Sequence, residues 1–210
     1  MNSIDTVYYI NLNHRSDRKE KFINWIFNSG FPLHKVERIE AIYNQTKGYI
    51  GCTMSHIKAL ETFINSNHNT CIIYEDDYTP IDYVNYWDNI GKIFETDINF
   101  DAMLLSYNDS ELSILDTKYN YIKKVLFTYT ASGYMIKKEF ASIILQNFQE
   151  CLKLCIEEEL KTNRNTETFC IDVFWRKLMR EYEFYCFYPR LGKQMESYSD
   201  ILQKIVDYKC

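Results

Sequence analysis

The stretch Thr70-Cys71-Ile72-Ile73-Tyr74-Glu75-Asp76-Asp77 decides how this sequence is interpreted. Residues 71–74 form an apolar run typical of a buried β-strand, and three consecutive carboxylates follow it directly. In an open α/β sheet, ligands bind in the crevice at the carboxyl ends of the strands. Three adjacent carboxylates there repel one another unless a cation or hydrogen-bond donors lie between them. The stretch therefore predicts a strand end that holds a divalent metal ion.

Length and composition set the limits of the interpretation. The 210 residues suit one α/β domain, which we expect to span 1–210. A content of 46% hydrophobic and 25% charged residues is typical of a globular protein with a sizeable core. The net charge of −5 provides no overall field for binding nucleic acid or an acidic membrane. No apolar run approaches the length of a membrane span, and nothing in the sequence indicates the oligomeric state.

The seven cysteines show no pattern of a metal or disulfide framework. None forms a CxxC motif, and the histidines nearby do not supply zinc-finger spacing. The first residues lack the basic-then-apolar pattern of a signal peptide. We therefore expect reduced thiols in a cytoplasmic compartment. Cys151 and Cys155, one helical turn apart, are expected to be packed or exposed thiols rather than ligands.

Strand and helix patterns alternate at the start of the chain. Residues 6–12 are continuously apolar and are predicted to form a buried strand. Ser16 or Asp17 could cap a following helix that runs to about Asn28. Residues 34–39 alternate between polar and apolar, which is typical of a strand near the edge of a sheet.

Two glycines, Gly48 and Gly51, come just ahead of a predicted helix whose apolar stripe includes Ile57 and Leu60. A glycine-rich approach to a helix N-terminus suits an anion, because unpaired N–H groups and the helix dipole point at it. A loop glycine followed by a core helix gives the same pattern, so the motif is unspecific on its own.

The alternation continues in the second half of the chain, and it predicts an α/β fold with a largely parallel sheet flanked by helices. We expect helices over residues 83–94, 139–160 (with one possible break) and 173–182, a hairpin or meander over 112–130, and strands over 100–106, 131–136 and 184–188.

Several motifs, in a fixed order, carry a resemblance to a known family. They are Tyr9-Ile10-Asn11-Leu12 with Arg15 and Asp17-Arg18, the stretch from Gly48 to His56, Glu75-Asp76-Asp77, the stretch from Ser132 to Ile136, and a tail with Tyr188-Pro189, Gln194 and Ser199-Asp200-Ile201. Together they resemble glycosyltransferase family 25, which includes collagen β(1-O)galactosyltransferases and bacterial lipooligosaccharide galactosyltransferases. The resemblance spans nearly the whole chain. It implies a GT-A fold, a nucleotide-sugar donor and usually Mn²⁺.

The chain departs from the pattern of the eukaryotic collagen enzymes of this family. The collagen enzymes of eukaryotes have a leader and more than one such domain, and we find neither pattern here. Abundant Asn, Ile, Lys and Tyr have AT-rich codons, which favours a large DNA virus over a bacterium as the source. We expect a free-standing module in bacterial or virus-infected host cytoplasm.

The resemblance also assigns the metal ligands. By similarity to the Asp-x-Asp pattern of GT-A enzymes, Asp77 would bind Mn²⁺ or Mg²⁺, both of which prefer hard oxygen ligands. Glu75 or Asp76 would then face the ribose or a metal-bound water. Asp200 is a second candidate metal ligand. The alternative is a solvated acidic turn with no ion.

Donor contacts are expected after the first strand and around the glycine motif. An arginine could approach phosphate as a fork, although Arg18 could equally form a salt bridge on a helix surface. His56 could touch a sugar hydroxyl or serve as a structural histidine. The donor-binding candidates are Asn11, Leu12, Arg15, Arg18, Gly51, Ser55, His56, Glu75, Asp76, Gly133, Tyr134 and Gln194.

The inverting outcome expected for the family needs a general base opposite the leaving group. Asp172 is the candidate, because it is a lone acid among apolar residues that would raise its pKa. It also matches a late Asp before a helix in the family. An N-cap role for this residue is the alternative.

The predicted function is metal-dependent transfer of a hexose, galactose or glucose, from a UDP-sugar to a hydroxyl of a glycan or of hydroxylysine in a collagen-like protein. One alternative is a non-catalytic nucleotide-sugar-binding module, which the intact carboxylates at 75–77 and Asp172 disfavour. Another is a receiver-like Mg²⁺-binding signalling module. That fold needs a phosphoacceptor Asp at a later strand end, and Asp101 begins its strand instead.

Overall fold

The computed structural model describes residues 3–162, 170–199 and 204–207. An eight-stranded sheet with the order β2-β1-β3-β8-β5-β9-β7-β6 forms its centre. Six of these strands run in one direction, and only β8 and β7 oppose them. This confirms the predicted, largely parallel sheet. The strands are β1 (Thr6–Asn11), β2 (Val36–Glu40), β3 (Thr70–Glu75), β5 (Ala102–Leu104), β6 (Ser113–Asp116), β7 (Ile122–Phe127), β8 (Gly133–Lys137) and β9 (Phe184–Phe187).

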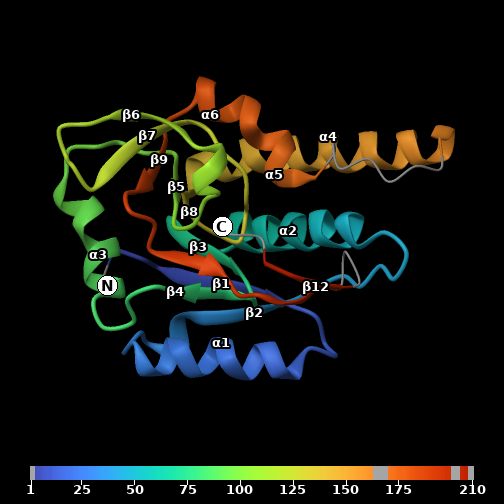
Figure 1. Ribbon diagram of the computed structural model, residues 1–210, viewed down its shortest axis with the longest axis horizontal. Helices are drawn as coiled ribbons and strands as arrows, with labels where there is room; N and C mark the ends of the chain where they lie inside the picture. Colours follow the sequence, from blue (N-terminus) through green and yellow to red (C-terminus); the bar gives the residue numbers. More distant parts are fainter. Residues whose placement is uncertain (1–2, 163–169, 200–203, 208–210) are drawn as a thin grey trace.

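Helices cover both faces of the sheet (Figure 1), so the fold has three layers. One face carries α1 (Ser16–Asn28) and α3 (Tyr86–Gly91), followed by the 3₁₀ helix η2 (Lys92–Glu95). The other face carries α2 (Gly48–Asn65), α4 (Lys138–Thr162), α5 (Ile171–Phe174), η5 (Trp175–Lys177) and α6 (Leu178–Glu181). Each face has its own apolar core because successive strand residues point to opposite sides. In β3, Ile73 packs under α2 while Ile72 and Tyr74 pack on the α1 side.

Most predicted elements are confirmed. β2 lies at the edge of the sheet, and β6 and β7 form an antiparallel hairpin at the opposite edge. Two short 3₁₀ helices, η1 (Leu33–Lys35) and η3 (Asp109–Glu111), precede β2 and β6. The helix α4 is continuous over its length, without the one possible break that the sequence allowed. Cys151 and Cys155 on α4 are both buried, as packed thiols would be, and no disulfide links the six cysteines that the structure describes.

Three predicted boundaries are wrong. The N-cap of α1 is Arg15, not Ser16 or Asp17, and the Asp17 carboxylate accepts bonds from the Arg15 guanidinium instead. The helix α3 begins at Tyr86, because the Asp82 carboxylate accepts bonds from the backbone N–H groups of residues 84 and 85 and holds them in a turn. The glycine motif does not precede α2 but forms its first turn, since the helix begins at Gly48.

The end of the chain returns to the carboxyl end of β3. There β10 (Gly192–Gln194) pairs with β4 (Tyr78–Pro80), which follows the acidic stretch directly. The Met195 N–H donates to the Asp77 carbonyl oxygen at 2.8 Å. A further antiparallel pair, β11 (Ser197–Ser199) and β12 (Lys204–Val206), follows. The tail therefore forms one wall of the region around Asp77.

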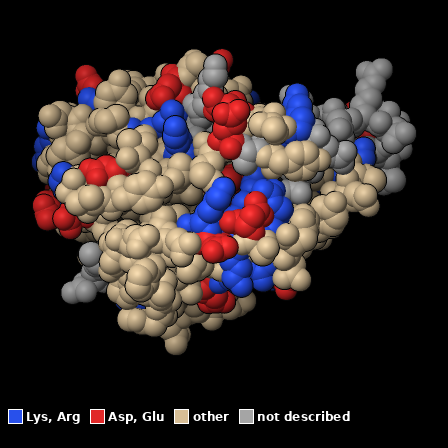
Figure 2. All heavy atoms as spheres, turned by 60° about the horizontal axis from the view of Figure 1, so that its bottom comes forward, with Lys and Arg blue, Asp and Glu red and all other residues tan. Residues whose placement is uncertain are grey.

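Charge is spread over the surface. On the face shown in Figure 2, Lys and Arg side chains lie among Asp and Glu side chains, so neither sign covers that face. Among the helices of the described ranges, none combines the length and the apolar character needed to cross a lipid bilayer.

Candidate functional site: a buried acidic strand end

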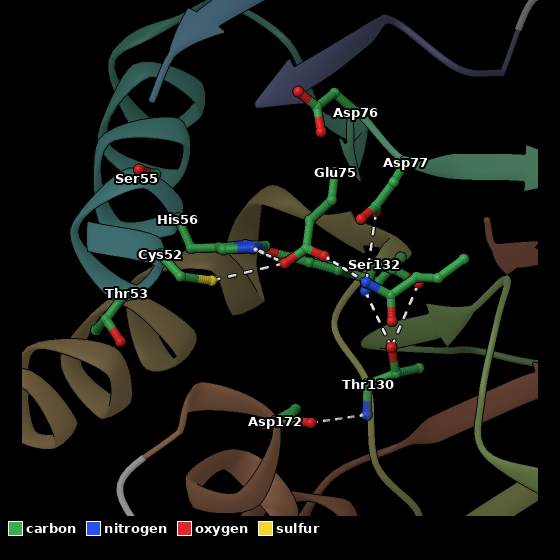
Figure 3. Close-up of polar contacts among 12 residues, drawn as sticks. Cys52, Thr53, Ser55, His56, Glu75, Asp76, Asp77, Thr130, Ser132 and Asp172 are labelled. Carbon is green, nitrogen blue, oxygen red and sulfur yellow. Dashed lines mark hydrogen bonds and ion pairs between the residues drawn. The ribbon is translucent and has the colours of Figure 1, made fainter. Parts of the chain in front are cut away.

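The three carboxylates that follow β3 point in different directions (Figure 3). Glu75 turns towards Cys52 and His56 of α2, whereas Asp76 bonds to Arg18 of α1. Asp76 and Asp77 are only 6% and 5% exposed, so neither belongs to a solvated acidic turn. Buried carboxylates need partners that compensate for lost hydration.

Arg18 of α1 supplies that compensation. Its Nη1 atom lies 2.9 Å from Asp76 Oδ1 and 3.1 Å from Asp77 Oδ2, and all three side chains are nearly buried. Burial alone would lower the pKa of Arg18, but the charges of Asp77 and Asp76 raise it, which keeps the guanidinium charged. Arg18 is therefore a buried counter-ion and not the surface salt bridge considered from the sequence.

One guanidinium does not neutralise the whole cluster. Burial, followed by the charge of Glu75, raises the pKa of Asp77 to about 7, although Arg18 opposes the shift. Burial also raises the pKa of Asp76 against the effect of Arg18. The strand end thus carries surplus negative charge that a further cation would stabilise.

Asn11 and Arg38 fix the orientation of Asp76. The side-chain amide nitrogen of Asn11 donates one hydrogen bond to Asp76 Oδ2 at 2.6 Å. It donates a second hydrogen bond to the Arg15 carbonyl oxygen. Arg38 of β2 donates to Asn11 Oδ1 at 3.0 Å, which sets the direction of the amide. Asn11 itself is 1% exposed and does not line the cavity, so in this structure it acts on the site through Asp76.

Glu75 lies among hydrogen-bond donors. His56 Nε2 lies 3.2 Å and Cys52 Sγ 3.6 Å from Glu75 Oε1, and the Gln194 amide donates to Oε2 at 3.0 Å. Burial raises the pKa of Glu75, but the bond and charge of His56, the bond from Cys52 and the charge of Arg18 together lower the pKa overall. Gln194 also lies 3.4 Å from Asp77 Oδ1, so it links two of the three carboxylates.

The carboxylates open onto a cavity between the ends of β1 and β3, the start of α2 and the returning tail. Of the residues predicted from the sequence, those that line it are Leu12, Arg18, Ser55, His56, Glu75, Asp76, Asp77 and Gln194. Arg15, Gly51, Gly133 and Tyr134 lie outside the lining. Asp200 is outside the residues that the structure describes.

The glycines of the predicted site are required by packing. A Cβ atom on Gly51 would lie 2.5 Å from the Ile42 carbonyl oxygen, so the first turn of α2 could not approach residues 42–44 as closely. Ser55 fixes the same contact, because its hydroxyl donates to the Gly51 carbonyl and accepts from the Ile42 N–H. A Cβ atom on Gly133 would meet the ring of Tyr78 at 2.6 Å. Gly51 and Gly133 therefore do not line the cavity but allow the close packing of the segments around it.

Asp172 lies in the first turn of α5, apart from the cavity lining. Its carboxylate accepts from the Thr130 N–H at 3.2 Å (Figure 3). Thr130 has a φ of 90°, a strained conformation for a β-branched residue. Burial raises the pKa of Asp172, and the charge of Glu75 adds to the shift. The N-cap of α5 is Cys170, so the alternative N-cap role for Asp172 is wrong.

Sequence similarity identifies the family. The model of glycosyltransferase family 25, described as an LPS biosynthesis protein, matches residues 33–157. The chain belongs to glycosyltransferase family 25. It is therefore a glycosyltransferase, which confirms the resemblance seen in the motifs. Comparison with curated protein sequences gives no match.

Several solved structures are similar to this family 25 glycosyltransferase. A197 from STIV is 14% identical with a TM-score of 0.54, over 97% of this chain and 93% of that one. Mannose-1-phosphate geranyltransferase from Thermus thermophilus is 7% identical with a TM-score of 0.49, over 88% and 74% of the two chains. A glycosyltransferase involved in glycosylation of the major capsid of PBCV-1 is 9% identical with a TM-score of 0.42, over 87% and 93%. The first of these structures shares the α/β architecture of this chain.

The residues of this glycosyltransferase fit a hard divalent cation at the strand end. Asp76 and Asp77 offer carboxylate oxygens, the ligand type that Mn²⁺ and Mg²⁺ prefer. Three carboxylates lie at the strand end beside the single guanidinium of Arg18, and burial followed by the charge of Glu75 raises the pKa of Asp77. A cation held there would share these two carboxylates with the guanidinium.

Sequence reasoning missed several residues of the site. Arg38 occupies a polar position of the edge strand β2. The sequence pattern predicts that such a side chain points into solvent, so it gave no sign of the contact with Asn11. The Tyr198 carbonyl accepts from both Arg15 and Arg18, and a backbone acceptor leaves no mark in a sequence. Cys52 lies four residues before His56. In a helix, this spacing places the two side chains on the same face, so the sequence contained a signal for the pair.

Proposed function

We propose that this family 25 glycosyltransferase is a metal-dependent inverting enzyme. It transfers a hexose, galactose or glucose, from a UDP-sugar to a hydroxyl group. The acceptor is a glycan, such as that of a lipopolysaccharide, or hydroxylysine in a collagen-like protein. We further propose that it acts in the cytoplasm of a bacterium or a virus-infected host, with the AT-rich residue bias favouring a large DNA virus.

One observation carries the proposal. Two buried aspartates share a single arginine at the carboxyl end of β3, beside a cavity lined by residues of β1, α2 and the tail. Breaking the bond to a nucleoside diphosphate leaves extra negative charge on the departing phosphates, which a positively charged site stabilises. Mn²⁺ bound by Asp77 would supply Lewis-acid stabilisation of that leaving group.

The chain's own residues supply binding and orientation. Arg18 adds a fixed positive charge beside the cation site, and Asn11 keeps Asp76 in place. Leu12, Ser55 and Gln194 line the space in which the donor would lie.

Asp172 is proposed as the general base that takes the proton of the acceptor hydroxyl as the new glycosidic bond forms. A half-buried carboxylate with a raised pKa is a stronger base than an exposed one, which suits this role. In the present structure its carboxylate is bonded to Thr130, so proton transfer requires the acceptor to approach that segment.

Titration calorimetry with UDP, with and without Mn²⁺, tests the proposal. We expect Mn²⁺ to strengthen UDP binding to the unaltered chain, and Asp77→Ala to abolish this gain. Asp116→Ala, which changes an exposed carboxylate on β6, is the matched control and should bind like the unaltered chain. Absence of UDP binding under both conditions would contradict the proposed donor. If UDP binds as expected, mass spectrometry of the products formed with a panel of UDP-sugars would identify the sugar that is transferred.

A further inference from the structure

A second group of potential metal ligands lies beside the acidic strand end. Cys52 and His56 are four residues apart on α2, so their side chains leave the helix on the same face. Glu75 reaches them from the end of β3 (Figure 3). Cys52 Sγ, a ring nitrogen of His56 and a carboxylate oxygen of Glu75 all lie within 4.8 Å of one another.

The separations of these atoms fit a tetrahedral zinc ion. Cys52 Sγ lies 3.6 Å from Glu75 Oε1, and His56 Nε2 lies 3.2 Å from the same oxygen. Zinc bonds of about 2.3 Å to sulfur and about 2.0–2.2 Å to nitrogen and oxygen place neighbouring ligands of a tetrahedron about 3.3–3.6 Å apart. These two separations match neighbouring positions of the tetrahedron, and the third, between Cys52 Sγ and the His56 ring nitrogen, is within 4.8 Å, so side-chain adjustments would bring all three atoms into coordination.

We propose that Cys52, His56 and Glu75 bind one Zn²⁺ ion, with the fourth coordination position open to the cavity. All three residues line the cavity, so a water molecule or an oxygen of a bound ligand could take the open position. A thiolate and a carboxylate carry two negative charges that the ion neutralises. Sulfur and imidazole ligands favour zinc over Mn²⁺ or Mg²⁺, so this site differs in chemistry from the oxygen-only pair Asp76 and Asp77.

The surrounding residues hold two of the ligands in place. His56 is fully buried, and its Nδ1 lies 3.0 Å from the Tyr134 hydroxyl, which leaves Nε2 directed at Glu75. The Gln194 amide donates to Glu75 Oε2 at 3.0 Å, which leaves Oε1 facing Cys52 and His56. Metal-binding histidines and carboxylates are commonly oriented by such outer partners. Tyr134 and Gln194 thus have a role that the motif comparison did not give them.

In a metal-free arrangement, the Cys52 thiol and a His56 N–H would both donate to Glu75. The two arrangements differ in zinc content and in the ionisation of Cys52. The zinc site does not depend on the identity of the donor or the acceptor, so it can be tested separately from the proposed glycosyl transfer.

The test measures zinc binding to the full chain by competition with a chromogenic chelator and by elemental analysis. We expect about one zinc per chain. Cys52→Ala should weaken zinc binding at least tenfold, and Tyr134→Phe by about 10-fold to 100-fold, because outer-sphere partners typically contribute that much. Cys71→Ala removes a thiol elsewhere in the core and should retain zinc. Asp77→Asn should also retain zinc, which separates this site from the proposed manganese site.

Cobalt(II) added to the unaltered chain provides a readout that needs no variant. Coordination by the Cys52 thiolate predicts a sulfur-to-cobalt charge-transfer absorption. Added zinc should displace the cobalt ion and remove this absorption. Absence of this band, or equal zinc affinity in folded Cys52→Ala and unaltered protein, would overturn the proposal. Circular dichroism verifies the folding of each variant, and if Cys52→Ala does not fold, the cobalt spectrum alone decides.

Discussion

The guanidinium of Arg18 joins two carboxylates, with Nη1 2.9 Å from Asp76 Oδ1 and 3.1 Å from Asp77 Oδ2. Its Nη2 atom donates to the Tyr198 carbonyl at 2.9 Å. A single side chain of α1 thus connects the end of β3 to strand β11 of the tail. Because the carboxylates are buried, the stability of the fold and the charge of the site depend on the same residue.

Replacing this counter-ion should destabilise the protein strongly. Arg18→Leu leaves Asp76 and Asp77 buried without their cation, and removing one partner of a buried ion pair costs about 3–5 kcal/mol. Urea denaturation at pH 7 measures the loss. Lys118→Met, which breaks an ion pair with Asp97 that is exposed on both sides, is the control and should leave stability nearly unchanged. Equal effects of the two substitutions would show that Arg18 does not compensate the buried charges.

Two glycines in helices should respond in opposite ways to alanine. Gly51→Ala places a methyl group 2.5 Å from the Ile42 carbonyl, and such overpacking costs about 1–3 kcal/mol. Gly91→Ala meets no atom within 4 Å and has helical dihedral angles, so alanine should stabilise the chain by about 0.5–1 kcal/mol. Chemical denaturation of both variants gives the comparison. A stable Gly51→Ala variant would mean that residues 42–44 can move away from α2.

Asp172 should make the stability depend on pH. Burial raises its pKa in the folded state above the ordinary value of 3.8, so the folded state binds more protons than the unfolded state just above that pH. This contribution to stability is present at low pH and is lost as the pH rises from 3.8 through the raised pKa. Asp172→Asn removes the dependence. The stability of this variant relative to the unaltered chain should therefore increase with pH over that window, as measured by urea denaturation at several pH values. A difference that stays constant with pH would contradict the raised pKa.

The same variant tests the proposed catalytic role of Asp172. An amide does not accept the proton of the acceptor hydroxyl, so Asp172→Asn should lose transfer while it retains UDP binding. Product analysis by mass spectrometry and calorimetry with UDP measure the two properties separately. Full turnover by the variant would exclude Asp172 as the base. Loss of UDP binding together with turnover would instead indicate that Asp172 supports the structure around Thr130.

Local patterns predicted the elements better than their ends. The apolar run of β1 and the alternation of β2 were recognised because burial on two faces or one face leaves a direct periodic signal. The start of α2 was misplaced because glycine is usual outside helices, whereas Gly48 and Gly51 lie inside the first turn. The reason for Gly51 is the nearby Ile42 carbonyl, a contact between segments that the glycine motif alone does not reveal.

The sequence by itself determined that a buried strand ends in three carboxylates within an alternating α/β chain, because hydrophobic period and residue type are local properties. Only the tertiary structure decided what each carboxylate does. Glu75 turns towards Cys52 and His56, while Asp76 and Asp77 share Arg18. Which side chains become neighbours depends on how α1, α2 and the tail pack around the sheet. Those contacts join residues far apart in the chain, so no short stretch of sequence specifies them.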